Sequence, residues 1–225
     1  MSEAGSTMGR RPSIYLASAS VPRRTILEEL GLAFGLLKVD VAEIVAVTAR
    51  ETVEENARRK LVAGLALAEK GAIVIAADTV LETQGRLLGK PADEIAATQY
   101  LQQLSGGSAI ACSAVAVAVT GAAQGSLATE TAEVHFKVLS PEIICWYLTT
   151  REPMGRAGAF GIGRFGEILT ESIDGGYSCV SGLPKTALVA ALASVAGEQM
   201  PEPLRHMPAA LMGTRVQLRS LAIHP

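Results

Sequence analysis

The hydrophobic positions of the chain fall into short continuous runs and into longer stretches with helical spacing. The continuous runs predict strands near residues 13–18, 34–39, 72–77, 110–120, 129–139 and 167–173. The helical spacing predicts helices near residues 22–30, 52–70, 93–104, 140–149 and 184–196. Because strands and helices interleave along the chain, the pattern predicts an α/β protein with a mixed central sheet.

Polar residues at the ends of these segments mark where elements begin and turn. Thr52 and Glu55 have the spacing of a capping box, and Asp93 and Ser140 are typical N-cap residues. Gln84-Gly85, between two apolar runs, predicts the turn of a hairpin.

The composition changes at both ends of this patterned region. After Gly197 the chain gains prolines and loses periodicity. We therefore divide it into a flexible N-terminus (1–12), one domain (13–197) and a C-terminal extension (198–225) that we expect to lie outside the core fold.

Composition and charge exclude several functional classes. With 49% hydrophobic and 19% charged residues, the chain is typical of globular proteins. A net charge of -2 argues against binding to a nucleic acid polymer through a broad basic surface. The uncharged stretch from Ile95 to Thr129 is interrupted by glutamine, serine and glycine, so we expect no membrane span.

Three cysteines, Cys112, Cys145 and Cys179, are far apart and match no zinc spacing. We interpret all three as buried free thiols that fill the core. Such thiols are typical of a reducing compartment, so we expect a cytoplasmic protein.

The first candidate site is the segment Ser18-Ala19-Ser20-Val21-Pro22-Arg23-Arg24. Arginines in the first turn of a helix oppose its dipole, so they do not serve helix stability. Together with the serines and the free amides of the turn, they are suited to bind an anion. The alternative is a solvated basic turn.

Further charged residues stand where a ligand can approach. Asp78 directly follows a buried run, and a carboxylate at the end of a strand can hold a hard cation or position a water molecule. Asn56 and Lys60 share one helix face. Lys90 stands between Gly89 and Pro91, which fix the backbone around it. A turn cap at Asp78 and a solvated Lys60 are the alternatives.

The glycine-dense stretch 155–166 permits close approach of the backbone to a ligand, although it is also compatible with a flexible hinge. No serine nucleophile accompanies the three histidines, and no glycine-rich run leads into Lys-Ser or Lys-Thr, so neither a Ser-His-Asp triad nor a P-loop is predicted.

In this order and spacing the blocks resemble the Maf-like (septum-formation inhibitor) nucleoside triphosphate pyrophosphatases over about residues 14–197. The matching segments are the Ser-x-Ser…Pro-Arg-Arg start, Glu43, the Glu-Asn-Ala…Lys block, Ala77-Asp78-Thr79, Leu88-Gly89-Lys90-Pro91, Leu104-Ser105-Gly106, 152–161 and Gly182-Leu183-Pro184. The resemblance implies a two-lobed Maf/ITPase-like α/β fold with a cleft between the lobes, often dimeric.

The resemblance also implies an activity and roles for individual residues. A metal-dependent diphosphatase of this family hydrolyses a nucleoside triphosphate to the monophosphate and pyrophosphate, with Mg²⁺ or Mn²⁺. Asp78 would be the catalytic carboxylate and, with Glu43, would hold the metal. The remaining residues would bind the nucleotide: Ser18, Ser20, Arg23, Arg24, Lys60, Thr79, Lys90 and Arg156.

Thr79 and Arg24 resemble the branch of the family that prefers dTTP and UTP. Three residues depart from the family pattern. Val21 stands as an extra residue before the proline, Arg156 replaces the usual lysine, and Gly163 replaces the usual glutamine of that branch. The last change removes an amide that can bind a base edge, which leaves the base preference open.

Two other functions stay open at this point. A nucleotide-binding protein of the same fold that has lost most turnover is the main alternative, because Val21 and Gly163 depart from the pattern. A nucleotidyltransferase also combines a carboxylate–metal pair with basic phosphate contacts, but the sequence offers no second substrate pocket.

Overall fold

The computed structural model describes residues 13–197, 200–205 and 217–223, so the predicted flexible N-terminus lies outside the described residues. The strands in these ranges are β1 Ile14–Leu16, β2 Gly35–Leu36, β3 Ile73–Thr83, β4 Arg86–Leu88, β5 Ser108–Val119, β6 Gln124–Phe136, β7 Thr170–Asp174 and β8 Gln217–Ala222. The helices are α1 Val21–Glu29, α2 Ala49–Leu65, α3 Glu94–Leu104, α4 Pro141–Thr149, the 3₁₀ turn η1 Ala157–Ala159, α5 Gly166–Leu169, α6 Tyr177–Val180, α7 Lys185–Ala196 and α8 Glu202–Arg205.

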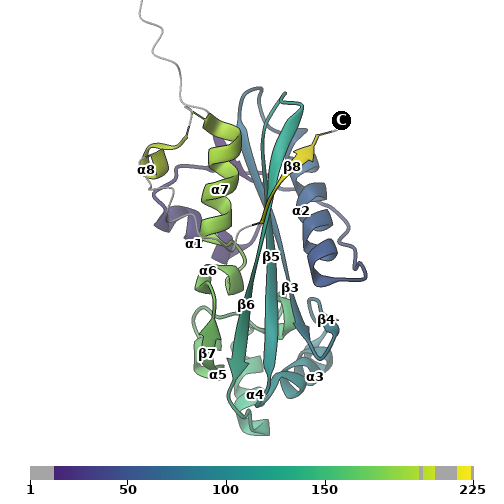
Figure 1. Ribbon diagram of the computed structural model, residues 1–225. Helices are drawn as coiled ribbons and strands as arrows, with labels where there is room; N and C mark the ends of the chain where they lie inside the picture. Colours follow the sequence, from purple (N-terminus) through teal and green to yellow (C-terminus); the bar gives the residue numbers. More distant parts are fainter. Residues whose placement is uncertain (1–12, 198–199, 206–216, 224–225) are drawn as a thin grey trace, which may run out of the picture.

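The described strands form one mixed sheet in the order β2-β1-β3-β5-β6-β7, with β4 paired to β3 and β8 paired to β6 (Figure 1). Strands β2, β1 and β3 run parallel, and the remaining pairs are antiparallel. The predicted α/β class with a mixed central sheet is therefore confirmed.

The short length of β1 opens a notch in the edge of β3. Strand β1 pairs with β3 only as far as Ile75, and β4 begins to pair with it at Leu81. Among the described residues, positions 76–80 of β3 therefore have no strand neighbour on this edge. The opposite edge of the same segment is fully paired with β5, so β3 continues straight through the notch.

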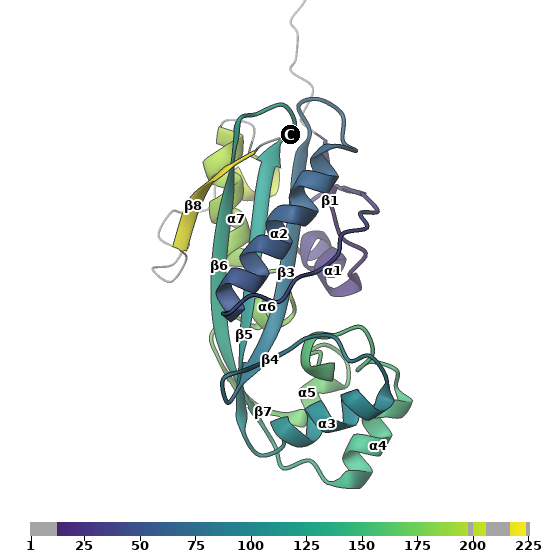
Figure 2. The same cartoon turned by 90° about the vertical axis from the view of Figure 1, so that its right-hand side faces the viewer.

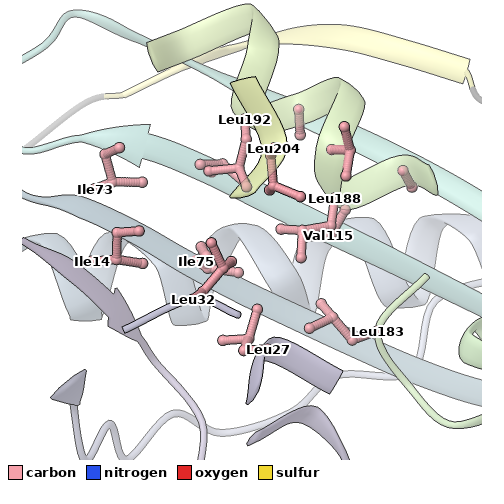
Figure 3. Packing of buried hydrophobic residues seen from close by; sticks show 14 of the residues in the cluster. Ile14, Leu27, Leu32, Ile73, Ile75, Val115, Leu183, Leu188, Leu192 and Leu204 are labelled. Atoms are coloured by element: carbon pink, nitrogen blue, oxygen red, sulfur yellow. The ribbon is translucent and has the colours of Figure 1, made fainter. Parts of the chain in front are cut away.

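Helices cover both faces of the upper part of the sheet, with α2 on one face and α1 and α7 on the other (Figures 1 and 2). Figure 3 shows Leu188 of α7 close to Val115 of β5 and Ile75 of β3 beside Leu32, and Leu192 belongs to the same cluster. Each fully buried leucine of this kind contributes about 1.5–3 kcal/mol to folding. The parallel end of the sheet is thereby a rigid support.

A second lobe surrounds the far end of the long strands, where α3, α4 and α5 gather (Figure 2). Its core contains Leu101, Phe136, Tyr147 and Phe160, and the rings of Phe136 and Phe160 meet edge to face with centroids 4.8 Å apart. The protein is thus two-lobed, as the family resemblance implies.

Several helix starts and one turn lie where the local sequence signals predicted them. Helix α4 begins at Pro141 behind the N-cap Ser140, and Asp93 caps α3 by accepting a hydrogen bond from the Ala96 amide. The hairpin turn lies at Gln84-Gly85, where both residues have positive φ, as a two-residue turn of this type requires.

The predicted start of α2 was wrong by one turn. The capping box is formed by Thr48 and Glu51, and Thr52 lies inside the helix. The pairs Thr48/Glu51 and Thr52/Glu55 have the same spacing. The added first turn buries Ala49, a small residue that a search for larger apolar residues misses. The helix also ends earlier than predicted, at Leu65.

Several predicted strands differ from the structure: β3 extends to Thr83, and β6 is Gln124–Phe136 where 129–139 was predicted. Strand β2 is only Gly35–Leu36, because it pairs with the short β1 alone. The prediction of a strand near 167–173 was wrong for its first part, since Gly166–Leu169 form the helical turn α5 and β7 begins at Thr170.

The segment after Gly197 does not lie apart from the core in its described parts. Strand β8 pairs with β6 along Gln124–Thr129, and Leu221 packs in the cluster under α2. Met200 and Leu204 pack against the cluster under α7. The expectation of an extension outside the core fold is corrected for these residues, while the boundary at 197 stays a prediction.

All three cysteines are free thiols, but only Cys112 and Cys179 are buried. Burial raises the pKa of Cys112 to about 11 and that of Cys179 to about 12, which makes both thiols unreactive. Cys145 is exposed on α4, where Ile144 and Tyr147 face the core, so its prediction as a buried residue was wrong. None of the described helices is long and apolar enough to cross a membrane.

Candidate active site

A cleft of about 520 Å³ opens at the notch in β3 and lies between the two lobes. Its walls come from the β1–α1 loop, the segment before α2, β3, the residues after β4, the glycine-dense loop and the turn after α6. Nine of the ten predicted site residues line it: Ser18, Ser20, Arg23, Glu43, Lys60, Asp78, Thr79, Lys90 and Arg156. The structure brings these residues together; their roles in binding and catalysis stay predictions.

Asp78 lies in the middle of β3, not directly after a strand as predicted. Asp78 is paired with Ala114 of β5, so the backbone stays extended on both sides of this residue. The strand that ends near Asp78 is instead the neighbouring β1, whose last pair with β3 is Leu16 with Ile75. The residue is 5% exposed, so it is a buried acid beside an open cleft.

Asp78 and its neighbour Thr79 serve opposite faces of the sheet, because successive side chains of a strand alternate. Asp78 contacts residues of α2, whereas Thr79 forms hydrogen bonds on the α7 side, with Ser113 Oγ at 2.8 Å and Gly182 O at 3.4 Å. Since the notch leaves this edge of β3 unpaired, the cleft reaches both faces. Two adjacent residues therefore supply different walls of one site.

On the α2 side, a chain of alternating charges crosses the cleft. Lys60 Nζ donates to Asp78 Oδ1 at 2.6 Å and to Glu43 Oε1 at 2.8 Å. Lys90 Nζ donates to the same Glu43 oxygen at 2.7 Å. Lys60 is only 9% exposed, so its ammonium interacts with both carboxylates with little screening by water.

These contacts determine the ionisation of Glu43. Burial alone would favour the neutral acid, but the hydrogen bonds and charges of Lys60 and Lys90 outweigh it and lower the pKa of Glu43 to about 2. Glu43 is therefore an anion at neutral pH, and the two carboxylates and two ammonium groups balance in charge.

The segment that carries Glu43 has no helix or strand of its own and is held by side chains of α2. Asn56 Oδ1 accepts a hydrogen bond from the Ile44 amide at 2.9 Å, and Thr52 Oγ1 accepts one from the Ala46 amide at 2.9 Å. The carboxylate thus reaches the cleft from a segment docked on the helix that also carries Lys60.

On the other face, Arg23 is fixed by three acceptors. Its guanidinium donates to Gly182 O at 2.9 Å, to Ser18 Oγ at 3.2 Å and to Thr79 Oγ1 at 3.4 Å. Burial lowers the pKa of Arg23, partly offset by the charges of Asp78 and Glu43, yet an arginine stays protonated at neutral pH. Arg23 therefore presents a fixed positive charge to the cleft.

The start of α1 adds further donors to this wall. Its N-cap residue Ser20 makes no side-chain capping bond, and the first turn contains no acidic residue. Amides at such a helix start are available for an anion. Val21 is the first helical residue and is exposed, so the extra residue is accommodated in the helix without entering the core.

Arg24 is the predicted site residue that does not line the cleft. Neighbouring helical residues point roughly 100° apart, so the Arg24 side chain points in a different direction from that of Arg23. The Nε atom of Arg24 is buried, with no hydrogen-bond partner among the described residues. Its predicted contact with the substrate receives no support from this geometry.

The glycine-dense loop forms the wall on the side of the second lobe. Arg156 Nε donates to Glu152 O at 3.2 Å, and Arg156 Nη2 lies 3.7 Å from the buried Glu152 Oε1. A Cβ at Gly161 would collide with the Arg156 side chain. The Gly158 amide donates to Gly89 O at 2.9 Å, which ties this loop to the residue before Lys90.

Gly163 does not line the cleft, and a Cβ added there would meet no atom within 4 Å. The space for a larger side chain is therefore present. Glycine at this position is not required by packing.

Glu43 and Asp78 are residues of the cleft that could hold a hard divalent cation. Glu43 and Asp78 both approach the single Lys60 Nζ, so their oxygens converge on one small region. In the described part of the chain, no group of three or more His, Cys, Asp or Glu residues is placed to hold a metal. Mg²⁺ is typically bound by one or two carboxylates, completed by water and substrate phosphates.

Several residues of the site were missed by the sequence analysis. Asn56 was noted as a neighbour of Lys60 on one helix face and as part of the Glu-Asn-Ala…Lys block, but no role was assigned to it. Ser113, which donates to Cys179 O at 2.7 Å, had no signal in the sequence, and the buried Glu152 was noted only as the first residue of the segment 152–161, with no role assigned to it. Their roles depend on strand pairing and loop packing between distant segments.

Comparison with known proteins gives a consistent assignment. The family model described as "Maf-like protein" matches residues 13–195. A dTTP/UTP pyrophosphatase of Pelotomaculum thermopropionicum is 39% identical over 177 residues, which cover 78% of this chain and 92% of the relative. A dTTP/UTP pyrophosphatase of Yersinia pestis is 41% identical over 175 residues (76% and 87%), and one of Symbiobacterium thermophilum is 40% identical over 173 residues (76% and 88%). The chain therefore belongs to the family of Maf-like proteins.

Proposed function

We propose that this protein is a nucleoside triphosphate pyrophosphatase that converts dTTP and UTP to the monophosphate and pyrophosphate. Relatives about 40% identical over most of the chain are dTTP/UTP pyrophosphatases. The observation that carries the proposal is the convergence of Asp78 and Glu43 on Lys60 in a cleft that Arg23 and Lys90 also line. These groups match what a metal–triphosphate complex requires.

The charged residues of the cleft serve to bind and align the triphosphate. Arg23, Lys90 and Arg156 line the cleft and would bind the phosphates there, together with the amides at the start of α1. Preorganised cations of this kind stabilise negative charge that develops on the leaving group. Because the contacts of Arg23 are already formed, little reorganisation is needed during the reaction.

The hydrolytic step needs a base beside the α-phosphorus. A water oxygen forms the new bond to the α-phosphorus, and the bond to the oxygen that bridges the α- and β-phosphates breaks. Pyrophosphate leaves with that oxygen, while the Asp78 carboxylate accepts the proton of the water. Mg²⁺ or Mn²⁺, held by Glu43 and Asp78, would supply charge neutralisation at the phosphates.

The test is release of pyrophosphate from a panel of canonical and modified nucleoside triphosphates, with Mg²⁺, with Mn²⁺ and with a chelator. We expect metal-dependent release, strongest with dTTP and UTP. Asp78→Asn should abolish turnover while nucleotide affinity stays within a few-fold. Asp40→Asn is a matched control, because Asp40 also lines the cleft but is exposed. Nucleotide binding without release by the unmodified protein would instead favour the impaired nucleotide-binding protein.

The base preference can be tested at Gly163. The glutamine that this branch of the family usually carries would add an amide, and the structure offers it space. We expect Gly163→Gln to favour dTTP and UTP over purine nucleotides by about 0.5–1.5 kcal/mol, the net contribution of one hydrogen bond. An unchanged ranking of bases would exclude this position from base recognition.

A homodimer, which the family resemblance implies, and a cytoplasmic location, which the free thiols favour, complete the proposal. Light scattering of the purified protein would test the first, and fractionation of cells the second.

A further inference from the structure

Asn56 connects the two acidic residues of the cleft. It lies on α2, one turn before Lys60, and is 3% exposed. Its amide nitrogen Nδ2 donates to Asp78 Oδ2 at 3.1 Å and to Ile44 O at 3.0 Å, and Oδ1 accepts from the Ile44 amide at 2.9 Å. Ile44 directly follows Glu43 in the chain, so one side chain holds both Asp78 and the backbone beside Glu43.

The orientation of this amide is determined by its partners. A carboxylate can only accept hydrogen bonds, so the NH₂ group must face Asp78, and the remaining oxygen must face the Ile44 amide. Both hydrogens of Nδ2 are then used. A carboxylate, hydroxyl or methyl group at this position cannot reproduce the same three bonds.

The two oxygens of Asp78 are therefore held by two residues one helical turn apart. Asn56 holds Oδ2 and Lys60 holds Oδ1, which fixes the plane of the carboxylate. If Lys60 turned to a phosphate of the substrate it would leave the Asp78 oxygen, whereas the neutral Asn56 amide would gain nothing from such a move. Asn56 is thus suited to keep Asp78 oriented while the substrate is bound.

We propose that Asn56 is a positioning residue for the pyrophosphatase reaction, which orients the Asp78 carboxylate and docks the Glu43 segment. This inference rests on the proposed function. It assigns to Asn56 no contact with the nucleotide, since Asn56 does not line the cleft. Loss of Asn56 should therefore affect turnover more than nucleotide affinity.

Thr52 provides a matched control on the same helix. It lies one turn before Asn56, is equally buried, and accepts a hydrogen bond from the Ala46 amide of the same segment at 2.9 Å. Its hydroxyl has no bond to Asp78: it donates to Thr48 O at 2.8 Å. Thr52→Val removes an anchor of the Glu43 segment at nearly constant volume and leaves the orientation of Asp78 intact.

The experiment measures kcat, KM, the Mn²⁺ concentration for half-maximal activity and the thermal midpoint of full-length Asn56→Ala, Asn56→Asp and Thr52→Val. For both Asn56 variants we expect kcat to fall ~10–100-fold, as for other residues that orient metal-binding groups. Nucleotide affinity, measured by calorimetry, should stay within about threefold. Asn56→Asp keeps the volume of the side chain, so its loss of turnover cannot come from a cavity.

The outcomes separate the inference from the proposed function. No turnover by the unmodified protein would overturn the proposed function itself. If the unmodified protein is active and the Asn56 variants are as active as Thr52→Val, only the role of Asn56 is overturned. Equal losses for Thr52→Val and Asn56→Ala would also overturn it, because docking of the segment would then explain the effect without Asp78.

Discussion

Lys60 Nζ lies 2.6 Å from Asp78 Oδ1 and 2.8 Å from Glu43 Oε1, so one buried ammonium group holds together two carboxylates from distant segments. Without it, the two anions would repel each other beside an apolar core. Because a divalent cation would need the same oxygens, the ammonium and the metal compete for one region. Under the proposed function, Lys60 would therefore have to leave these oxygens for a phosphate of the nucleotide before a metal could bind them.

This competition predicts weak binding of metal in the absence of nucleotide. We expect Lys60→Met to bind Mn²⁺ alone at least tenfold more tightly than the unmodified protein, since a neutral side chain leaves both carboxylates free to coordinate. The measurement is a Mn²⁺ titration followed by electron paramagnetic resonance. Lys90→Met is the control: among the described residues Lys90 forms its salt bridge with Glu43, not with Asp78, and it is half exposed, so its effect should be smaller. Tight binding of Mn²⁺ by the unmodified protein without nucleotide would contradict this order.

The low pKa of Glu43 predicts a dependence of stability on pH. Burial raises this pKa, but the hydrogen bonds from Lys60 and Lys90 lower it by more than burial raises it. The net effect is a decrease from 4.5 to about 2. A lowered pKa stabilises the folded state above the unfolded value and loses this effect as pH falls through the folded value. The difference in unfolding free energy between the unmodified protein and Glu43→Gln should thus be largest above about pH 4.5 and shrink toward pH 2.

Urea denaturation of both proteins between pH 6 and pH 3 measures this difference. Glu43 is more than one-third exposed, so water screens its ion pairs and the effect on stability should be modest. A difference that stays constant over this range, or grows on acidification, would show that Glu43 is not held as an ion by the two lysines.

The close contact between Gly161 and Arg156 predicts an unusual effect of a small substitution. In Gly161→Ala the new methyl group would displace the Arg156 side chain from the cleft wall. We expect nucleotide affinity to fall toward that of Arg156→Ala, with turnover at saturation less affected. Gly163→Ala is the control, because its methyl group meets no atom. Nucleotide affinity is measured by calorimetry. Equal affinities of Gly161→Ala and Gly163→Ala would exclude a role for the position of Arg156 in binding.

Elements with local causes could be predicted from the sequence. Proline in the first turn, Asp93 and Ser140 as N-caps, and the Gln84-Gly85 turn all act within a few residues, so the sequence alone places α1, α3, α4 and the hairpin. The capping box shows the limit of this approach. Two identical patterns lie one turn apart, and only packing of the added turn against the sheet selects Thr48.

The site itself was predictable in its charged residues and less so in its geometry. Asp78 ends an apolar run, which suggested the end of a strand, but pairing of β3 with β5 extends the strand beyond it. That pairing joins residues 36 apart and leaves no local trace. The contact of Asp78 with Asn56 could not be predicted for the same reason. Nor could β8, because its partner β6 precedes it by about 90 residues.

Strand β8 predicts that the C-terminal segment contributes to stability, although it lies beyond the family match at residues 13–195. Leu221 is 9% exposed in the cluster under α2, whereas Leu218 on the same strand is 46% exposed. We expect Leu221→Ala to lower the free energy of unfolding by about 2 kcal/mol, at the lower end of the range for buried leucines because the site is at the rim of the core. Leu218→Ala should change it by no more than about 0.5 kcal/mol. Urea denaturation of both variants decides the matter, since equal stabilities would mean that β8 does not pack on the core in solution.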